Sequence, residues 1–230
     1  MSNIMTDEII IVTTNYKEEN TMKIAVIAAN GKASKAIIAE AAERGWEITG
    51  FGRHENDTRA QHYVKKDIMD LTKEDLEGFD AVVDGFGGWT EKTLPLHTTT
   101  VLHLADILSG TDTRLLVVGG AGSLYTDDSQ SMMISEAPDF PDAYIPVANA
   151  MAAALKELRK RNDVKWTYIS PAAEFIPDGK RTGAYELHGE VFAPNKKGES
   201  IISYADYAIA MADEIEKGNH IRERISVVEA

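Results

Sequence analysis

The chain has 230 residues, 37 of them acidic and 24 basic, with a formal net charge of −13. This length is enough for one α/β domain with a sizeable core. The acidic balance, and the lack of any basic run longer than residues 159–161, argue against nucleic acid as a partner. The chain has no cysteine, which excludes disulfides, thiolate nucleophiles and cysteine-based zinc sites and agrees with a cytoplasmic protein.

The sequence also lacks the signals of membrane and metal-binding proteins. No apolar run approaches the roughly 18 residues that span a bilayer, and the six histidines show no metal-ligand spacing. Residues 1–21 lack the basic start and apolar core of a secretory signal, although residues 9–12 form a short strand-like run. We therefore predict no metal and no membrane, an N-terminal extension over residues 1–21, and one domain over residues 22–230.

Residues 22–53 read as strand, glycine turn, helix and strand. Residues 23–29 form an apolar run typical of a strand buried on both faces of a parallel sheet. Asn30 and Gly31 turn the chain into an amphipathic helix over residues 32–44, and residues 46–51 form the next strand. The start of such a helix can bind a pyrophosphate through its free N–H groups and its dipole.

The glycine fingerprint of dinucleotide-binding turns is reduced here. The pattern G-x-x-G-x-x-G falls on Ala28, Gly31 and Ser34, so only the central glycine remains. An ordinary strand-to-helix turn without a nucleotide is the alternative. Arg53, twenty-two residues after Gly31, favours NADP, because an arginine there suits the 2′-phosphate. NAD stays open, since Arg53 could instead be a plain surface residue.

Strand and helix patterns alternate along the rest of the chain. We expect strands near residues 62–64, 80–84, 114–118 and 164–169, and helices near residues 72–77, 98–108 and 147–161. This order predicts a three-layer, Rossmann-like, doubly wound α/β fold with a mostly parallel sheet.

Two of these strands end in glycine-rich segments, where ligands bind in such sheets. The first segment contains Gly85, Phe86 and Gly87, and the second runs over residues 119–125. Ser123 and Tyr125 carry the only hydroxyl groups of the second segment and are the candidate catalytic residues, because a hydroxyl can polarise a carbonyl. A turn in which Ser123 caps a helix and Tyr125 packs is the alternative.

The last third is expected to supply the substrate side. Pro171 and Ala172 could pack on a nicotinamide and Phe175 could wall a planar substrate, although core packing would explain them equally well. Residues 185–188 and 191–193 look like a hairpin. Ser203 and Asp206 have capping spacing ahead of a helix.

Four segments taken together resemble one family: residues 22–53, 119–125, 169–185 and 202–206. Within the third of these segments, residues 169–173 and 181–185 carry the likeness. The segments are similar to the atypical short-chain dehydrogenase/reductases, in particular the NAD(P)H-binding group of NmrA-like, NADH-flavin reductase-like and biliverdin-IXβ reductase-like proteins. The resemblance covers nearly everything after Met22. It implies a Rossmann-type sheet with a small C-terminal substrate-side region, NADPH or NADH as cofactor, and flavin as acceptor.

The Tyr-x-x-x-Lys pair of standard short-chain reductases is absent. Tyr144 lies near the expected place, but the residue four positions later is Ala148, and Pro146 places Tyr144 before its helix. Lysine normally lowers the pKa of that tyrosine so that it can transfer a proton. We therefore interpret Tyr144 as structural.

We predict an NAD(P)H-dependent oxidoreductase that transfers hydride from NADPH to a flavin-like, small carbonyl or quinone acceptor. The alternative is a non-catalytic NmrA-like redox sensor that binds dinucleotide and acts through a protein partner. Sugar-nucleotide epimerisation is disfavoured, because it usually needs the missing tyrosine and lysine. The sequence leaves the oligomeric state open. The expected cofactor-binding residues are Ala29, Asn30, Gly31, Lys32, Ala33, Ser34, Arg53, Gly85, Phe86, Gly87, Gly119, Gly120, Pro171 and Ala172.

Overall fold

The computed structural model describes residues 21–230, so the strand-like run at residues 9–12 lies outside the described residues. The strands are β1 (Lys23–Ile27), β2 (Glu47–Gly52), β3 (His62–Lys65), β4 (Ala81–Asp84), β5 (Arg114–Val118), β6 (Lys165–Ser170), β7 (Glu174–Ile176), β8 (Tyr185–His188), β9 (Ile201–Ser203) and β10 (Glu223–Glu229). The α-helices are α1 (Lys32–Glu43), α2 (Leu96–Ile107), α3 (Ile145–Leu158) and α4 (Tyr204–Lys217). Short 3₁₀ turns cover Ile68–Asp70, Ala121–Ser123, Ile134–Glu136 and Asp142–Tyr144.

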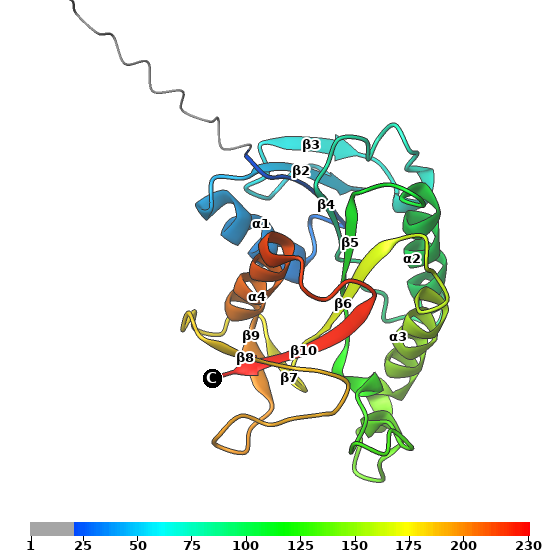
Figure 1. The fold of residues 1–230 in the computed structure, drawn as a ribbon, viewed down its shortest axis with the longest axis vertical. Coiled ribbons are helices and arrows are strands. Elements are labelled where there is room, and N and C mark those ends of the chain that lie inside the picture. The colour runs from blue at the N-terminus through cyan, green and yellow to red at the C-terminus, as the bar shows by residue number, and fades with distance from the viewer. Residues whose placement is uncertain (1–20) are drawn as a thin grey trace, which may run out of the picture.

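The main sheet has eight strands in the order β3-β2-β1-β4-β5-β6-β10-β8. Its strands pair in parallel except β8, which runs antiparallel to β10 at one edge. Helices α1 and α4 lie on one face of this sheet and α2 and α3 on the other (Figure 1). The three-layer Rossmann-like prediction is therefore confirmed. The strand order reverses between β1 and β4, and ligands of doubly wound sheets bind at such a point.

Both faces of β1 are buried, which explains its unbroken apolar sequence. Ile24 and Val26 pack toward α1 and α4, whereas Ala25 and Ile27 pack toward α2 and α3. The other parallel strands divide their side chains between the same two clusters, so the sheet lies between two apolar cores. Burial of this kind is the main favourable term in folding.

The helix expected at residues 72–77 is not formed, and that prediction is wrong. The Asp75 carboxylate accepts hydrogen bonds from the Thr72 N–H at 2.7 Å and the Thr72 hydroxyl at 3.1 Å. Only a single turn follows, in which the Leu76 N–H donates to the Lys73 carbonyl, and Gly78 then adopts a φ of +83°. Such local side-chain bonds compete with helix propagation, and a six-residue segment cannot offset the cost of helix nucleation.

The expected hairpin over residues 185–193 is also wrong. Strand β8 pairs instead with β10, with Ser226 opposite His188 and Glu229 opposite Tyr185. Val191 forms only an isolated bridge, to Tyr125. Alternating apolar residues around a glycine identify a strand but not its partner. The sequence analysis predicts no strand at β10, so it could not name the true partner of β8.

The capping interpretation is confirmed for Ser203, whereas the Asp206 side chain bonds to the preceding loop in place of closing a capping box. The Ser203 hydroxyl accepts the Asp206 N–H at 2.9 Å at the start of α4. The Asp206 carboxylate in turn accepts hydrogen bonds from the N–H groups of Thr182 at 3.0 Å and Gly183 at 2.9 Å. The start of α4 therefore anchors the loop between β7 and β8.

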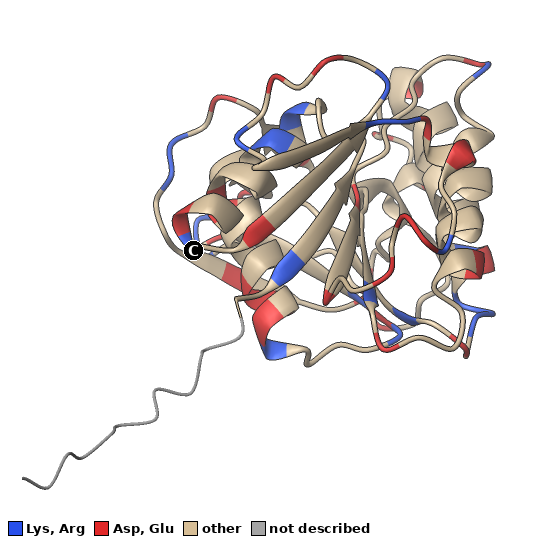
Figure 2. Ribbon diagram, turned by 90° about the horizontal axis from the view of Figure 1, so that it is seen from above, with Lys and Arg blue, Asp and Glu red and all other residues tan. Residues whose placement is uncertain are grey.

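Positive and negative side chains are mixed along the described chain, where basic segments alternate with acidic ones (Figure 2). Over residues 21–230, no helix is both long enough and apolar enough to cross a membrane.

Candidate functional site

The predicted cofactor residues other than Arg53 follow the carboxyl ends of four neighbouring parallel strands, β1, β4, β5 and β6. Ile27 of β1 is in register with Asp84 of β4, and Asp84 with Val117 of β5. Val118 is in register with Ile169 of β6. Because the four strands end together, the turn at Gly31 and the segments after β4, β5 and β6 all start at one edge of the sheet.

The turn between β1 and α1 has the geometry of a phosphate-binding turn. Gly31 is the N-cap of α1, and no side chain of residues 21–230 caps this helix. The Gly31 N–H donates to the Ala28 carbonyl at 2.9 Å, which closes the turn. The N–H groups of Lys32, Ala33 and Ser34 therefore form an uncapped first turn, and an anion can accept hydrogen bonds from it.

Ala28 has a φ of +54°, a conformation that normally favours glycine. It occupies the first position of the reduced fingerprint, so the backbone keeps the shape of the glycine turn although the glycine is absent. Alanine in this region is disfavoured by roughly 1–2 kcal/mol. Such backbone strain is concentrated at binding and catalytic sites.

Asn30 connects this turn to the loop after β2. Its amide donates to the Glu55 carbonyl at 2.9 Å, and its side-chain oxygen accepts the Tyr63 hydroxyl. Lys35 and Asn30 both bind the Asp57 carboxylate and hold its pKa below the usual range. The side chain of Asn30 therefore has a positioning role, and its backbone remains in the turn.

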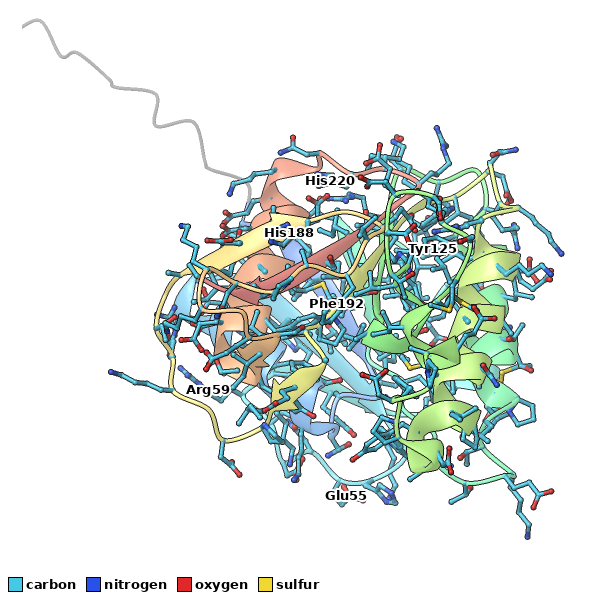
Figure 3. The ribbon with its side chains drawn as sticks, turned by 90° about the horizontal axis from the view of Figure 1, so that it is seen from below. Glu55, Arg59, Tyr125, His188, Phe192 and His220 are labelled. Carbon is cyan, nitrogen blue, oxygen red and sulfur yellow. The ribbon has the colours of Figure 1, made fainter. Side chains whose placement is uncertain are left out.

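Arg53 lies at the start of that loop, with its side chain 71% exposed and its Nε 3.9 Å from an Asp67 carboxylate oxygen. This contact is too long for a hydrogen bond. Strands β2 and β5 are separated by β1 and β4, which places their ends roughly 14 Å apart. Glu55 in the loop after β2 and Tyr125 in the segment after β5 lie well apart in Figure 3.

Buried polar groups fix the segment after β4. Asp84 is 3% exposed and accepts the Phe86 N–H at 3.0 Å, and burial raises the pKa of its carboxyl to about 6. His97 Nε2 lies 2.9 Å from the Gly88 carbonyl oxygen, and burial lowers the pKa of this imidazole. A small cavity of about 10 Å³, lined among others by Asp84, His97 and Tyr168, lies under this segment. From the sequence, Asp84 is predicted only as the last residue of a strand, and its burial is not.

In the segment after β5, the chain packs tightly on β6. A Cβ atom on Gly119 would lie 2.3 Å from the Tyr168 ring, so only glycine fits there. Ser123 is 5% exposed, and its hydroxyl lies 3.0 Å from Nη1 of Arg224, which donates to it. The Arg224 guanidinium also lies 5.6 Å from the Tyr125 ring centre. Sequence reasoning missed Arg224, because a single arginine on an unrecognised strand carries no signal.

The segment after β6 starts with two buried residues and is more exposed from Ala173 onward. Pro171 and Ala172 are both buried, and the Phe175 ring packs 4.0 Å from the Tyr204 ring and 4.9 Å from the Tyr207 ring, between centres. Phe175 thus belongs to an aromatic cluster at the start of α4. The catalytic roles of Ser123 and Tyr125, the substrate role of Phe175 and the cofactor contacts all stay predictions.

The proton-transfer pair of standard short-chain reductases is absent from this site. Tyr144 is the N-cap of α3 and is 52% exposed, and Ala148 follows one turn later. No group of three or more histidine, aspartate or glutamate side chains could hold a metal ion within residues 21–230.

Comparisons with known proteins agree with this geometry. The sequence profile of the NAD(P)H-binding family matches residues 28–217. YwnB, an uncharacterized protein of Bacillus subtilis (strain 168), is 44% identical over 210 residues, which are 90% of this chain and 98% of YwnB.

Two solved structures also share the fold. A candidate NADH-flavin reductase from Streptococcus pneumoniae TIGR4 is 54% identical, with a TM-score of 0.89 over 91% of this chain and 100% of that one. A candidate epimerase from Bacteroides thetaiotaomicron is 31% identical, with a TM-score of 0.80 over 91% of this chain and 97% of that one. The family match and the shape of the Gly31 turn lead to one conclusion: this chain belongs to the NAD(P)H-binding family of Rossmann-fold proteins.

Proposed function

We propose that this chain is an oxidoreductase that binds NADPH and directs hydride to a planar acceptor, of which a flavin is the leading candidate and a quinone or small carbonyl compound the next. One observation carries the proposal. The uncapped first turn of α1 lies at the same sheet edge as the glycine segments after β4 and β5. The similarity to a protein named as a candidate NADH-flavin reductase supports it.

The residues of this site would bind and orient the reactants. The first turn of α1 would bind the pyrophosphate, with Gly31 allowing close approach. Gly85, Phe86 and Gly87 would contact the dinucleotide on one side, and Gly119 and Gly120 on the other. Pro171 and Ala172 would limit the nicotinamide pocket. The common strand edge supports this arrangement, because it brings these segments to one side of the sheet.

A bound NADPH would supply the hydride. Reduction of an electron-poor ring depends on alignment of donor and acceptor, and solvent can supply the accompanying proton. This requirement suits a site without a tyrosine and lysine pair. Carbonyl reduction usually needs a protein acid near the oxygen, so the flavin is the better match to these residues.

NADPH is proposed ahead of NADH because of Arg53. Among residues 21–230 its exposed guanidinium has only the 3.9 Å contact with Asp67, and Arg53 follows the end of β2, near which the ribose of a dinucleotide binds in such folds. A phosphate oxygen is a stronger partner for this group than a ribose hydroxyl.

A non-catalytic redox sensor remains the second candidate. The hydroxyl of Ser123 is bound by Arg224, and Tyr144 has no lysine one turn away. A protein that binds dinucleotide without turnover would need neither group. Such a protein would signal through a change in its surface when the cofactor binds.

Consumption of NADPH and NADH with a panel of flavins, quinones and aldehydes separates the two candidates. The measured quantity is the loss of absorbance of the reduced nicotinamide. We expect turnover with flavins and lower kcat/KM with aldehydes. Tight NADPH binding without turnover on any acceptor would favour the sensor. Absence of binding to both cofactors would contradict both candidates.

A further inference from the structure

Two aromatic side chains are unusually exposed beside the candidate site. Trp89 is 68% exposed and Tyr144 is 52% exposed, the two highest fractions among the large apolar side chains of residues 21–230. Their ring centres are 6.2 Å apart and their planes meet at 74°. Aromatic side chains usually bury most of their area, so this exposed pair offers apolar surface that nothing within the described chain covers.

The pair connects the two glycine segments of the candidate site. Trp89 directly follows the segment after β4, which contains Gly88. Tyr144 is the N-cap of α3, one helical turn before Ala148. A Cβ atom on Gly122, in the segment after β5, would lie 2.5 Å from the Ala148 Cβ, so this helix start packs closely on that segment. Since β4 and β5 are neighbours, both rings lie beside the site.

Ordered backbone supports both rings. His97 contacts the backbone of Gly88, and the Thr90 N–H donates to the Thr93 hydroxyl at 3.0 Å in the turn that follows Trp89. The Tyr144 N–H donates to the Pro141 carbonyl at 3.0 Å. The exposure of Trp89 and Tyr144 is therefore a property of the folded loops.

We propose that Trp89 and Tyr144 form the binding surface for the planar conjugated ring of the hydride acceptor, with Trp89 providing the stacking face. This inference rests on the proposed reductase function and adds the residues that select the acceptor. A fused heteroaromatic ring covers a tryptophan face, whereas a small aliphatic carbonyl compound cannot. Tyr144 acts here through its ring and not as a proton donor.

Fluorescence provides a direct test, because the chain has three tryptophans in very different environments. Trp46 is 6% exposed and Trp166 is 2% exposed, so Trp89 is the one that a bound ring can contact. Riboflavin, which carries no phosphate, is the probe. We expect strong saturable quenching of tryptophan emission in the unmodified protein and clearly weaker quenching in Trp89→Phe, in which only energy transfer from the buried Trp46 and Trp166 remains. Binding to Trp89→Phe is then followed by the emission of riboflavin itself.

Steady-state kinetics with NADPH and riboflavin complete the test. Because each of these changes removes an aromatic face or edge that the flavin ring would contact, Trp89→Ala and Tyr144→Leu should each raise the KM for riboflavin about tenfold. Trp89→Phe and Tyr144→Phe keep a ring and should recover most of that affinity. The dissociation constant of NADPH should not change. Leu187→Ala is the matched control, because Leu187 is 45% exposed on β8.

Each outcome decides the inference. If the unmodified protein reduces riboflavin but Trp89→Ala and Tyr144→Leu keep its KM within about twofold, the acceptor surface is wrong and the reductase function stands. If the unmodified protein reduces no flavin, the flavin part of the proposed function fails. In that case saturable quenching through Trp89 still supports the ring-binding surface, and its absence overturns that as well.

Discussion

The hydroxyl of Ser34 occupies the space that a side chain on residue 85 would need. An ideal Cβ atom on Gly85 would lie 2.1 Å from Ser34 Oγ. Ser34 lies in the first turn of α1, at the third position of the fingerprint, where a glycine is usual. The helix α1 therefore still packs closely against the end of β4, but here the glycine that allows this contact is Gly85 after the strand and not residue 34 in the helix. Ser34 Oγ is buried and has no hydrogen-bond partner within the described residues.

This contact predicts strong coupling between the two positions. Gly85→Ala should destabilise the protein by about 1–3 kcal/mol through overpacking. The same change in a Ser34→Ala background should cost clearly less, because the clashing oxygen is gone. A smaller penalty remains from the Ile27 carbonyl oxygen, 3.1 Å from the added Cβ atom. Denaturant unfolding of the four proteins measures the coupling. Strictly additive losses would contradict this account.

Gly31→Val tests the phosphate-binding turn. Gly31 has a φ of −65°, which any residue can adopt, and its added Cβ atom would lie 3.2 Å from the Ala28 carbonyl oxygen. The fold should therefore survive, with a small local shift, while the branched side chain obstructs phosphate approach. We expect NADPH affinity to fall at least about tenfold, measured by calorimetric titration. Unchanged affinity in a folded variant would show that the cofactor binds elsewhere.

Arg53→Ala should weaken NADPH and leave NADH nearly unchanged. A hydrogen bond between charged groups is worth about 1.5–3 kcal/mol, so the selectivity for NADPH should fall at least about tenfold. Arg59→Ala is the matched control, since Arg59 is also exposed and its guanidinium lies 3.3 Å from a Glu43 oxygen. Equal losses for the two cofactors would refute the role of Arg53 in selecting the 2′-phosphate.

The buried carboxyl of Asp84 should make the folded protein less stable as the pH rises. Burial raises its pKa from 3.8 to about 6, so between these values the folded state keeps a proton that the unfolded state has lost. At about 1.4 kcal/mol per pKa unit, Asp84 opposes folding by about 3 kcal/mol above pH 6 and by almost nothing near pH 4.

Asp84→Asn should therefore be more stable than the unmodified protein at pH 7, and the two should converge toward pH 4. The amide oxygen can still accept the Phe86 N–H. Denaturant unfolding across this pH range measures the difference, with the exposed Asp128→Asn as control. A constant difference at all pH values would mean that ionisation of Asp84 is not its cause.

Ser123→Ala and Tyr125→Phe should each lower kcat by about tenfold or less. A true general acid contributes about 10² to 10⁴, and the Ser123 hydroxyl is already bound by Arg224. Measurement of kcat with saturating NADPH and riboflavin decides this. A loss of a thousandfold in either variant, with cofactor affinity intact, would identify a dedicated proton donor.

Local patterns predicted most of the elements correctly. The apolar run at β1, the strand at β5 and the Ser203 cap of α4 all depend on neighbours in sequence, which is why composition and spacing reveal them. The helix at residues 72–77 failed for a local reason as well, since the bonds of Thr72 to Asp75 favour an isolated turn. The hairpin prediction for residues 185–193 was wrong for a long-range reason. Strand β8 pairs with β10, which lies about forty residues further along the chain.

The sequence by itself determined the Rossmann-like class, the mostly parallel sheet and the location of the glycine turn at Gly31 between β1 and α1. Hydrophobic period and glycine position specify these features within short segments. Only the tertiary structure decided that Gly85 makes room for Ser34, that Arg224 binds Ser123 and that Asp84 is buried beneath a glycine loop. Each of these relationships joins residues from separate strands and helices, and the environment of a side chain is fixed only when those elements pack together.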